Sequence, residues 1–90
     1  MIIEWDENKN DINIKKHHID FNDAYKIFEN PILAKVDDRY DYGVKRWIGL
    51  GQLENICVDF VFTMRGKKLR IISIRKANQN EKEVYNEPIK

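Results

Sequence analysis

The stretch from Leu69 to Ala77, which reads Leu-Arg-Ile-Ile-Ser-Ile-Arg-Lys-Ala, decides the fold. A leucine and three isoleucines give it the composition of a β-strand, with cations inside it and at its C-terminal end. Strict alternation would place Ile71 and Arg75 on one face and Ile74 on the other. Because both faces then carry apolar side chains, we predict an interior strand that delivers cations to one rim of a sheet. The same pattern also fits a central strand whose basic ends are only solvated.

The segment before this strand, Ile56 to Arg65, shows the clearest alternation in the chain, with an apolar side chain at every second position. The sequence Arg65-Gly66-Lys67-Lys68 follows as a turn, so the two segments are expected to form an antiparallel hairpin. Asp59 is an acid in an otherwise apolar strand. We expect it to pair with Arg70 across the hairpin, which would make it a structural residue.

The rest of the chain predicts helices and short strands around this hairpin. The expected elements are a short apolar start at Met1 to Trp5, a helix capped by Asp6 that runs to about His18, a helix capped by Asn22 that ends at Asn30-Pro31, strands at Ile32 to Val36 and Arg46 to Leu50, a turn at Gly51 to Asn55, and a last helix capped by Asn78 that runs to about Glu87. This order predicts an α+β fold, with helices segregated from an antiparallel sheet of about four strands.

Length and composition limit the class of protein. The chain has 90 residues, of which 34% are charged, and a net charge of +1, so we assign residues 1–90 to a single domain with one modest core. The charges are unevenly spread, because Arg65 to Lys76 holds six cations and no acid. A local basic surface is therefore compatible with a near-neutral total, whereas a DNA-binding protein in its own right is disfavoured.

The cysteine usage and the apolar segments bear on the compartment. Cys57 lies alone in an apolar run, which predicts a buried thiol and excludes an intrachain disulfide. The sequence shows no cationic-then-apolar leader, and no apolar stretch approaches the ~20 residues that span a bilayer. We therefore expect a cytoplasmic protein that does not contact a membrane.

Metal and cofactor chemistry find little support in the residue pattern. His17 and His18 are adjacent and point in different directions on a helix, and Cys57 lies in the middle of a strand, so no tetrahedral ligand set is visible. The glycines are scattered and form no phosphate-binding loop. We expect neither a metal nor a cofactor.

RNA cleavage needs no metal, because the substrate carries its own nucleophile, the 2′-hydroxyl. Arginine suits the phosphate, since its planar guanidinium donates two hydrogen bonds and stays charged. On this logic Arg65, Arg75 and Lys76 hold the scissile phosphate. His17 is the candidate for moving protons. Two other interpretations remain open: His17 serves only the helix dipole, and Arg65 is only a solvated cation of the turn.

Two sequence blocks resemble a known family, the BrnT ribonuclease toxins of type II toxin–antitoxin systems, and the resemblance runs nearly from end to end. The matching residues are Glu4-Trp5-Asp6, Lys9, Asn13, Lys16-His17, Ile19, Phe21, Ala24, Phe28, Pro31, Arg46, Gly51, Thr63, Arg65, Arg70-Ile71-Ile72-Ser73, Arg75-Lys76-Ala77, Glu81 and Tyr85. The chain departs from the family at His18, where glycine is frequent, and at Ile74, where alanine is usual. Histidine tolerates the left-handed conformation that glycine would adopt there.

The resemblance implies a RelE-like fold and a metal-independent RNA endonuclease that inhibits translation. It further implies neutralisation by a BrnA-like antitoxin, a ribbon-helix-helix protein, in a toxin–antitoxin heterotetramer that contacts DNA only through the antitoxin. The residues expected to act in catalysis are His17, Arg65, Arg75, Lys76 and Tyr85, and those expected to bind RNA are Lys16, Arg46, Arg70, Lys67 and Lys68. The alternative function is a non-catalytic interaction module that binds a regulatory partner through its basic sheet face.

Overall fold

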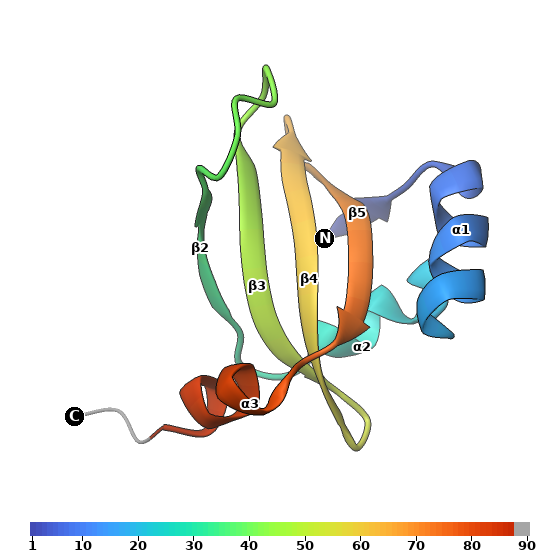
Figure 1. The fold of residues 1–90 in the computed structure, drawn as a ribbon. Coiled ribbons are helices and arrows are strands. Elements are labelled where there is room, and N and C mark those ends of the chain that lie inside the picture. Colours follow the sequence, from blue (N-terminus) through green and yellow to red (C-terminus); the bar gives the residue numbers. More distant parts are fainter. Residues whose placement is uncertain (88–90) are drawn as a thin grey trace.

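A five-stranded sheet forms the centre of the structure, a computed structural model that describes residues 1–87 (Figure 1). The elements are β1 (Ile2–Glu4), α1 (Glu7–His17), a 3₁₀ turn (Phe21–Asp23), α2 (Ala24–Ile27), β2 (Leu33–Asp37), β3 (Arg46–Leu53), β4 (Ile56–Arg65), β5 (Lys68–Lys76) and α3 (Gln79–Asn86). The strand order is β1-β5-β4-β3-β2. Strands β2 to β5 form the expected antiparallel sheet, and β1 joins its edge parallel to β5. The α+β prediction is confirmed.

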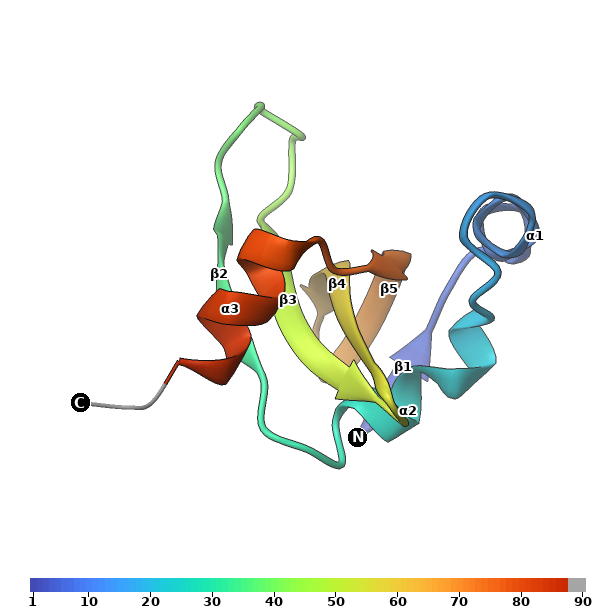
Figure 2. The ribbon, with the colours of Figure 1, turned by 60° about the horizontal axis from the view of Figure 1, so that its bottom comes forward.

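The hydrophobic core lies on the face of the sheet that α2 and the 3₁₀ turn cover. Phe21 and Ile27 are fully buried there against Phe60 and Ile71 of the central strands. Helix α3 lies on the opposite side of the sheet from α2 (Figure 2). We call that opposite side the open face, and its residues include Asp59 and the residue paired with it in register, Arg75.

A bulge in β5 changes the faces that strict alternation predicted. Phe62 pairs with Ile71 and the preceding Val61 pairs with Ser73, so Ile72 is an extra residue on β5. Beyond the bulge the alternation is reversed, and Ile74 is fully buried opposite the core residue Phe60. The prediction that Ile71 and Arg75 share a face is therefore wrong: Arg75 lies on the open face.

The register of the hairpin also corrects the expected partner of Asp59. Arg65 pairs with Lys68 around a two-residue turn, whose Gly66 has a φ of 62°. This short turn places Arg70 opposite Thr63, near the edge strand, where Arg70 forms an ion pair of 3.6 Å with Glu4. Asp59 instead pairs with Arg75, at 3.1 Å.

The first and last helices begin as predicted. The Asp6 side chain accepts hydrogen bonds from the first turn of α1, and Asn78 and Glu81 form a capping box at the start of α3. Helix α1 ends at His18, whose φ of 60° is the left-handed conformation that glycine favours. Histidine therefore occupies this position without altering the helix end.

Two boundaries differ from the prediction. The cap before the second helix is Asp20, which accepts from the backbone N–H of Asn22, and a 3₁₀ turn precedes the four-residue α2. Strand β3 continues through Gly51 to Leu53, so only two residues form the turn before β4. Glycine fits inside this strand because a Cβ atom on Gly51 would lie 2.7 Å from Cγ2 of Ile27.

Buried asparagines attach α1 to the sheet. The Asn13 side chain donates to the carbonyl oxygens of Ile19 and Ile74, both at 2.9 Å, and accepts from the Ile74 N–H at 3.1 Å. Asn10 accepts from the Phe21 N–H at 2.8 Å. Strand β1 pairs only with the beginning of β5. Farther along β5, the Asn13 side chain supplies hydrogen-bond partners for the N–H and C=O groups of Ile74, which β1 does not reach. The weakly apolar α1 is thus held by polar side chains.

Candidate functional site

Two adjoining hollows are lined by four of the residues that the sequence singled out, Lys16, His17, Arg65 and Arg70. The first, of about 180 Å³, lies between α1 and β5, and the second, of about 590 Å³, lies at the hairpin end of β4 and β5. They share Lys9 and Ile72, and none of the described residues that line them is acidic. We call this region the basic surface, and its charged or titratable members are Lys9, Lys16, His17, Lys45, Arg65 and Arg70.

His17 is the titratable group of the basic surface whose pKa is shifted toward the neutral form. It is half-buried at the last position of α1. Burial, followed by the charges of Lys16, Arg75 and His18, lowers the pKa of His17 below its ordinary value of 6.5. The imidazole is therefore neutral near pH 7 and can accept a proton.

The second hollow presents two arginines and two lysines, which come from α1, the loop before β3, β4 and β5. Arg65 is exposed and forms no ion pair with any residue among 1–87, whereas Arg70 is half-buried beside Glu4. The Thr63 hydroxyl donates to the carbonyl oxygen of Lys45 at 2.6 Å, which attaches the preceding loop to β4. These contacts hold positive charges around a space that is open to solvent.

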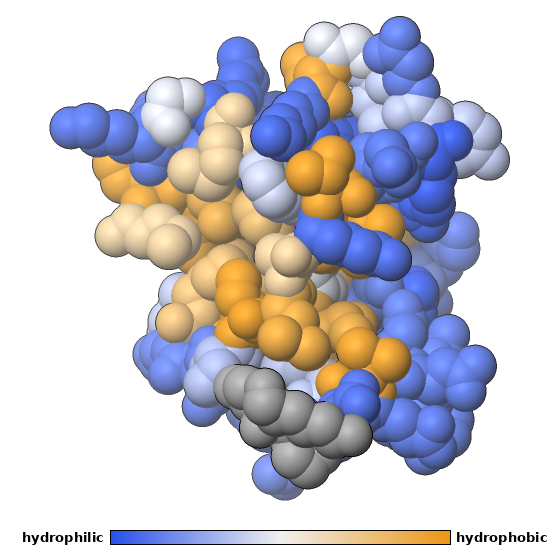
Figure 3. Space-filling view, turned by 90° about the vertical axis from the view of Figure 1, so that its left-hand side faces the viewer, coloured by the Kyte–Doolittle hydropathy of each residue, from blue (hydrophilic) through white to orange (hydrophobic). Residues whose placement is uncertain are grey.

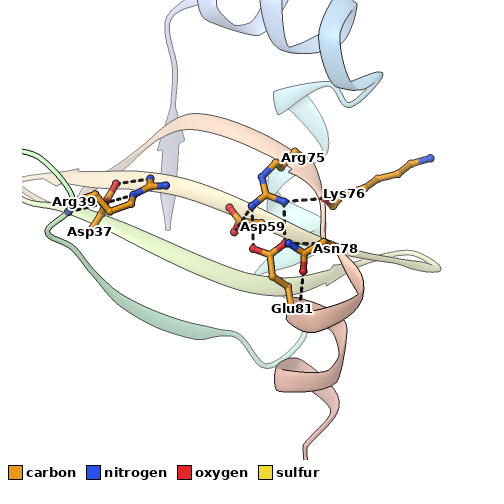
Figure 4. A network of polar contacts seen from close by, with 7 residues as sticks. All are labelled: Asp37, Arg39, Asp59, Arg75, Lys76, Asn78 and Glu81. Atoms are coloured by element: carbon orange, nitrogen blue, oxygen red, sulfur yellow. Dashed lines mark hydrogen bonds and ion pairs between the residues drawn. The ribbon is translucent and has the colours of Figure 1, made fainter.

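Arg75 lies outside the basic surface, in a third hollow beside α3. Its guanidinium donates to Asp59 at 3.1 Å and to both carboxylate oxygens of Glu81 at 2.9 Å (Figure 4). Lys76 is exposed and points away from this cluster in the same view. Arg75 thus already contacts two carboxyl groups, and its contact with Glu81 links α3 to the sheet.

The two carboxyl groups around Arg75 titrate very differently. Burial, with a smaller contribution from Glu81, raises the pKa of Asp59 to about 7 despite the nearby Arg75. Burial also opposes ionisation of Glu81, but hydrogen bonds with Asp59, Arg75 and the Asn78 N–H lower the pKa of Glu81 to about 2. The pair therefore shares one proton near neutral pH, and the carboxylate charge resides on Glu81.

The remaining predicted site residues are dispersed. The Tyr85 hydroxyl donates to the Pro31 carbonyl oxygen at 2.7 Å, so it anchors α3 near the start of β2. The Arg46 guanidinium stacks on Tyr42, 3.8 Å from the ring centroid, with its Nε 3.9 Å from the buried Asp37. Lys67 and Lys68 are exposed at the hairpin turn and line none of the three hollows described above.

The predicted residues thus fall into separate groups: Lys16 and His17 line the first hollow, and Arg65 and Arg70 line the second. Arg75 lines the third hollow but is near enough to His17 for its charge to act on the imidazole. Lys76, Tyr85 and Arg46 line none of the three. Sequence reasoning missed Lys9 and Lys45. A signal for Lys9 existed, because it precedes Lys16 by seven residues on α1 and therefore shares its helix face. Lys45 had no such signal, since its place depends on how the loop before β3 folds.

Three further findings concern the described residues. No group of three His, Cys, Asp or Glu side chains within residues 1–87 is arranged to hold a metal ion. None of the helices in this part of the chain has the length and apolar character needed to cross a membrane. Cys57 is buried, as predicted, and burial raises the pKa of its thiol.

The comparison with protein families agrees with the resemblance seen in the sequence. Residues 5–81 match the family described as "Ribonuclease toxin, BrnT, of type II toxin-antitoxin system". No curated protein matches the chain. Because the match covers most of its length, the chain belongs to the BrnT family of ribonuclease toxins of type II toxin–antitoxin systems.

Proposed function

We propose that this toxin is a metal-independent endoribonuclease whose active site is the basic surface. The observation that carries the proposal is the convergence of cations from α1, the loop before β3 and the β4–β5 hairpin on adjoining hollows with no acidic lining among the described residues. A polyanion is the ligand that such a surface attracts, since it neutralises charges that otherwise repel one another.

The reaction we propose is attack of the 2′-hydroxyl on the adjacent phosphorus. The bond from the 2′-oxygen to phosphorus forms, the bond from phosphorus to the 5′-oxygen breaks, and the products are a 2′,3′-cyclic phosphate and a 5′-hydroxyl. Neutral His17 accepts the proton of the 2′-hydroxyl, and Arg65 with Arg70 stabilises the charge that develops on the phosphate. Lys16 or water supplies the proton to the leaving oxygen. Arg75 has a positioning role, because its donors already engage Asp59 and Glu81.

The cellular consequence we propose follows from RNA cleavage. Loss of messenger RNA in the cytoplasm stops translation, and a BrnA-like antitoxin prevents this by binding the toxin. In this proposal the complex is a heterotetramer built on a ribbon-helix-helix dimer, and its DNA contacts belong to the antitoxin. The family membership supports an antitoxin partner.

Cleavage of a defined RNA by purified, antitoxin-free protein in EDTA tests the reaction. We expect wild type to leave a 2′,3′-cyclic phosphate and to spare a substrate with one 2′-deoxy position at the cleaved site. Arg65→Ala should lose about 10²- to 10³-fold in rate, and His17→Ala about 10²- to 10⁴-fold. Lys82→Ala, an exposed cation on α3, is the matched control and should cleave like wild type.

The pH profile adds an independent readout. Since the pKa of His17 lies below 6.5, the rate of wild type should fall as the pH decreases through that pKa, because the protonated imidazole cannot act as a base. The fall should be absent from the residual activity of His17→Ala. Intact RNA with a folded wild-type sample would refute the proposal and favour the non-catalytic binding module. Cleavage that requires a divalent cation would refute the metal-independent reaction.

A further inference from the structure

The third hollow has a chemical character unlike that of the basic surface. It encloses about 440 Å³ between β2, β3 and α3, and apolar side chains line much of it, including Leu33, Leu50 and Val84. Figure 3 shows apolar surface through the middle of this side of the molecule, with hydrophilic residues around it. We call this hollow the apolar groove. Its walls include Leu33, which is 45% exposed, and Val84, which is 53% exposed.

Strand β2 forms one wall of the apolar groove and is the last strand of the sheet order. It pairs with β3 on one side, and no strand within residues 1–87 pairs with its other side. Alternate N–H and C=O groups of an edge strand point outward and can pair with another chain. Leu33 on this strand lines the groove, whereas Val36, which is 41% exposed, lies toward the other face of the sheet. The groove and the edge are therefore one continuous binding surface.

Nucleic acid does not fit this surface. Arg75 is engaged by Asp59 and Glu81, and Arg39 donates to the buried Asp37 at 2.8 and 2.9 Å. Both guanidiniums that line the groove therefore have carboxylate partners, and a phosphate would have to displace them. Apolar lining with satisfied charges is characteristic of a protein-binding site.

A second copy of the chain fits poorly for an electrostatic reason. Lys35 is the central residue of β2, is exposed, lines the groove and forms no ion pair among residues 1–87. Two β2 strands paired antiparallel about their centres would bring Lys35 directly opposite its own copy, and like charges in that position are destabilising. The complementary partner is a strand with apolar side chains that carries a carboxylate opposite Lys35.

We propose that the apolar groove and the free edge of β2 form the docking surface for the antitoxin. An extended antitoxin segment adds to the sheet beside β2, places apolar side chains against Leu33 and Val84, and directs a carboxylate toward Lys35. This inference rests on the proposed neutralisation by an antitoxin, but not on the ribonuclease reaction. The surface is separate from the basic surface, since the two share no lining residue.

Binding of the antitoxin encoded beside the toxin gene, measured by calorimetry with full-length toxin variants, tests the surface. Leu33→Asp and Val84→Asp should each weaken the Kd at least tenfold, and Lys35→Glu should weaken it more than Lys35→Ala. Tyr25→Asp, at an exposed aromatic residue of α2 that lines no hollow described above, is the matched control and should stay within twofold of wild type. RNA cleavage by all of these variants should remain that of wild type.

Hydrogen exchange of the complex tests the mode of binding. Strand addition predicts that the antitoxin slows exchange of alternate amides within residues 33–37, the ones that do not pair with β3. Unchanged Kd values for Leu33→Asp and Val84→Asp, or unchanged exchange in β2, would overturn the inference. A concentration-dependent toxin dimer that protects β2 without antitoxin would also overturn it. If the variants weaken antitoxin binding while wild type cleaves no RNA, the inference stands and the proposed function fails.

Discussion

Replacing Asn13 by alanine should strongly destabilise this protein. The Asn13 side chain forms three hydrogen bonds with the backbone of Ile19 and Ile74 and is only 4% exposed. A net hydrogen bond contributes about 0.5–1.5 kcal/mol, so the loss of three is about 1.5–4.5 kcal/mol. The Ile74 N–H would also remain buried without a partner, because β1 does not extend along that part of β5.

This loss is large relative to the stability expected of the whole domain. At about 0.05–0.15 kcal/mol per residue, a chain of this length unfolds with about 5–13 kcal/mol. Asn13→Ala should therefore remove a large share of the stability and lower the Tm by more than about 10 °C. Helix α1 should also detach from β5, since the asparagine is its main polar attachment to the sheet.

Urea unfolding followed by tryptophan fluorescence measures the effect, with Asn8→Ala as the matched control. Asn8 lies on the exposed side of the same helix, and alanine raises helix propensity equally at both positions, so this contribution cancels in the comparison. Asn8→Ala should stay within about 0.5 kcal/mol of wild type. If the unfolding free energies of the two variants differ by less than about 1 kcal/mol, the attachment of α1 through Asn13 is not what stabilises it.

The remaining predictions concern the sheet, α3 and pH. Gly49→Ala should cost about 1–3 kcal/mol because its Cβ would lie 2.4 Å from Cζ of Phe60, and the smaller Phe60→Leu side chain should reduce that cost in the double variant, as urea midpoints would show. Asn78→Ala removes half of the capping box, so it should cost about 0.5–2 kcal/mol and speed amide exchange in α3. The pKa of about 7 for Asp59 lies above its unfolded value of 3.8, so the folded state binds the extra proton. Stability should consequently fall as the pH rises from 5 to 7.5, and Asp59→Asn should flatten that slope; a slope unchanged in the variant would contradict this assignment.

Separation of the two surfaces has a consequence for how the toxin could be controlled. The basic surface and the apolar groove share no lining residue, but Arg75 and Glu81 connect the groove to β5, the strand that also carries Arg70 and Ile72. An antitoxin that docks on β2 and α3 therefore contacts the element that Arg75 attaches to the sheet. Inhibition through that contact, rather than by covering the phosphate-binding cations, is consistent with the geometry of both sites.

The sequence alone determined the features that depend on neighbouring residues. The alternation from Ile56 to Arg65, the two-residue turn at Gly66 and the caps Asp6 and Asn78 each require only a local pattern, and all are present. The concentration of cations between Arg65 and Lys76 was also visible. These features act over a few residues, so propensity and spacing predict them directly.

Only the tertiary structure decided how the charges are used. The bulge at Ile72 places Arg75 on the face of the sheet that carries Asp59. No local sequence pattern predicts a bulge at that position. The buried role of Asn13 likewise depends on a strand 61 residues away in sequence. His17 and Arg65 line adjoining hollows because α1 lies along the edge of β5. Register and long-range packing determine such contacts, and they pair residues whose separation in the chain carries no periodic signal.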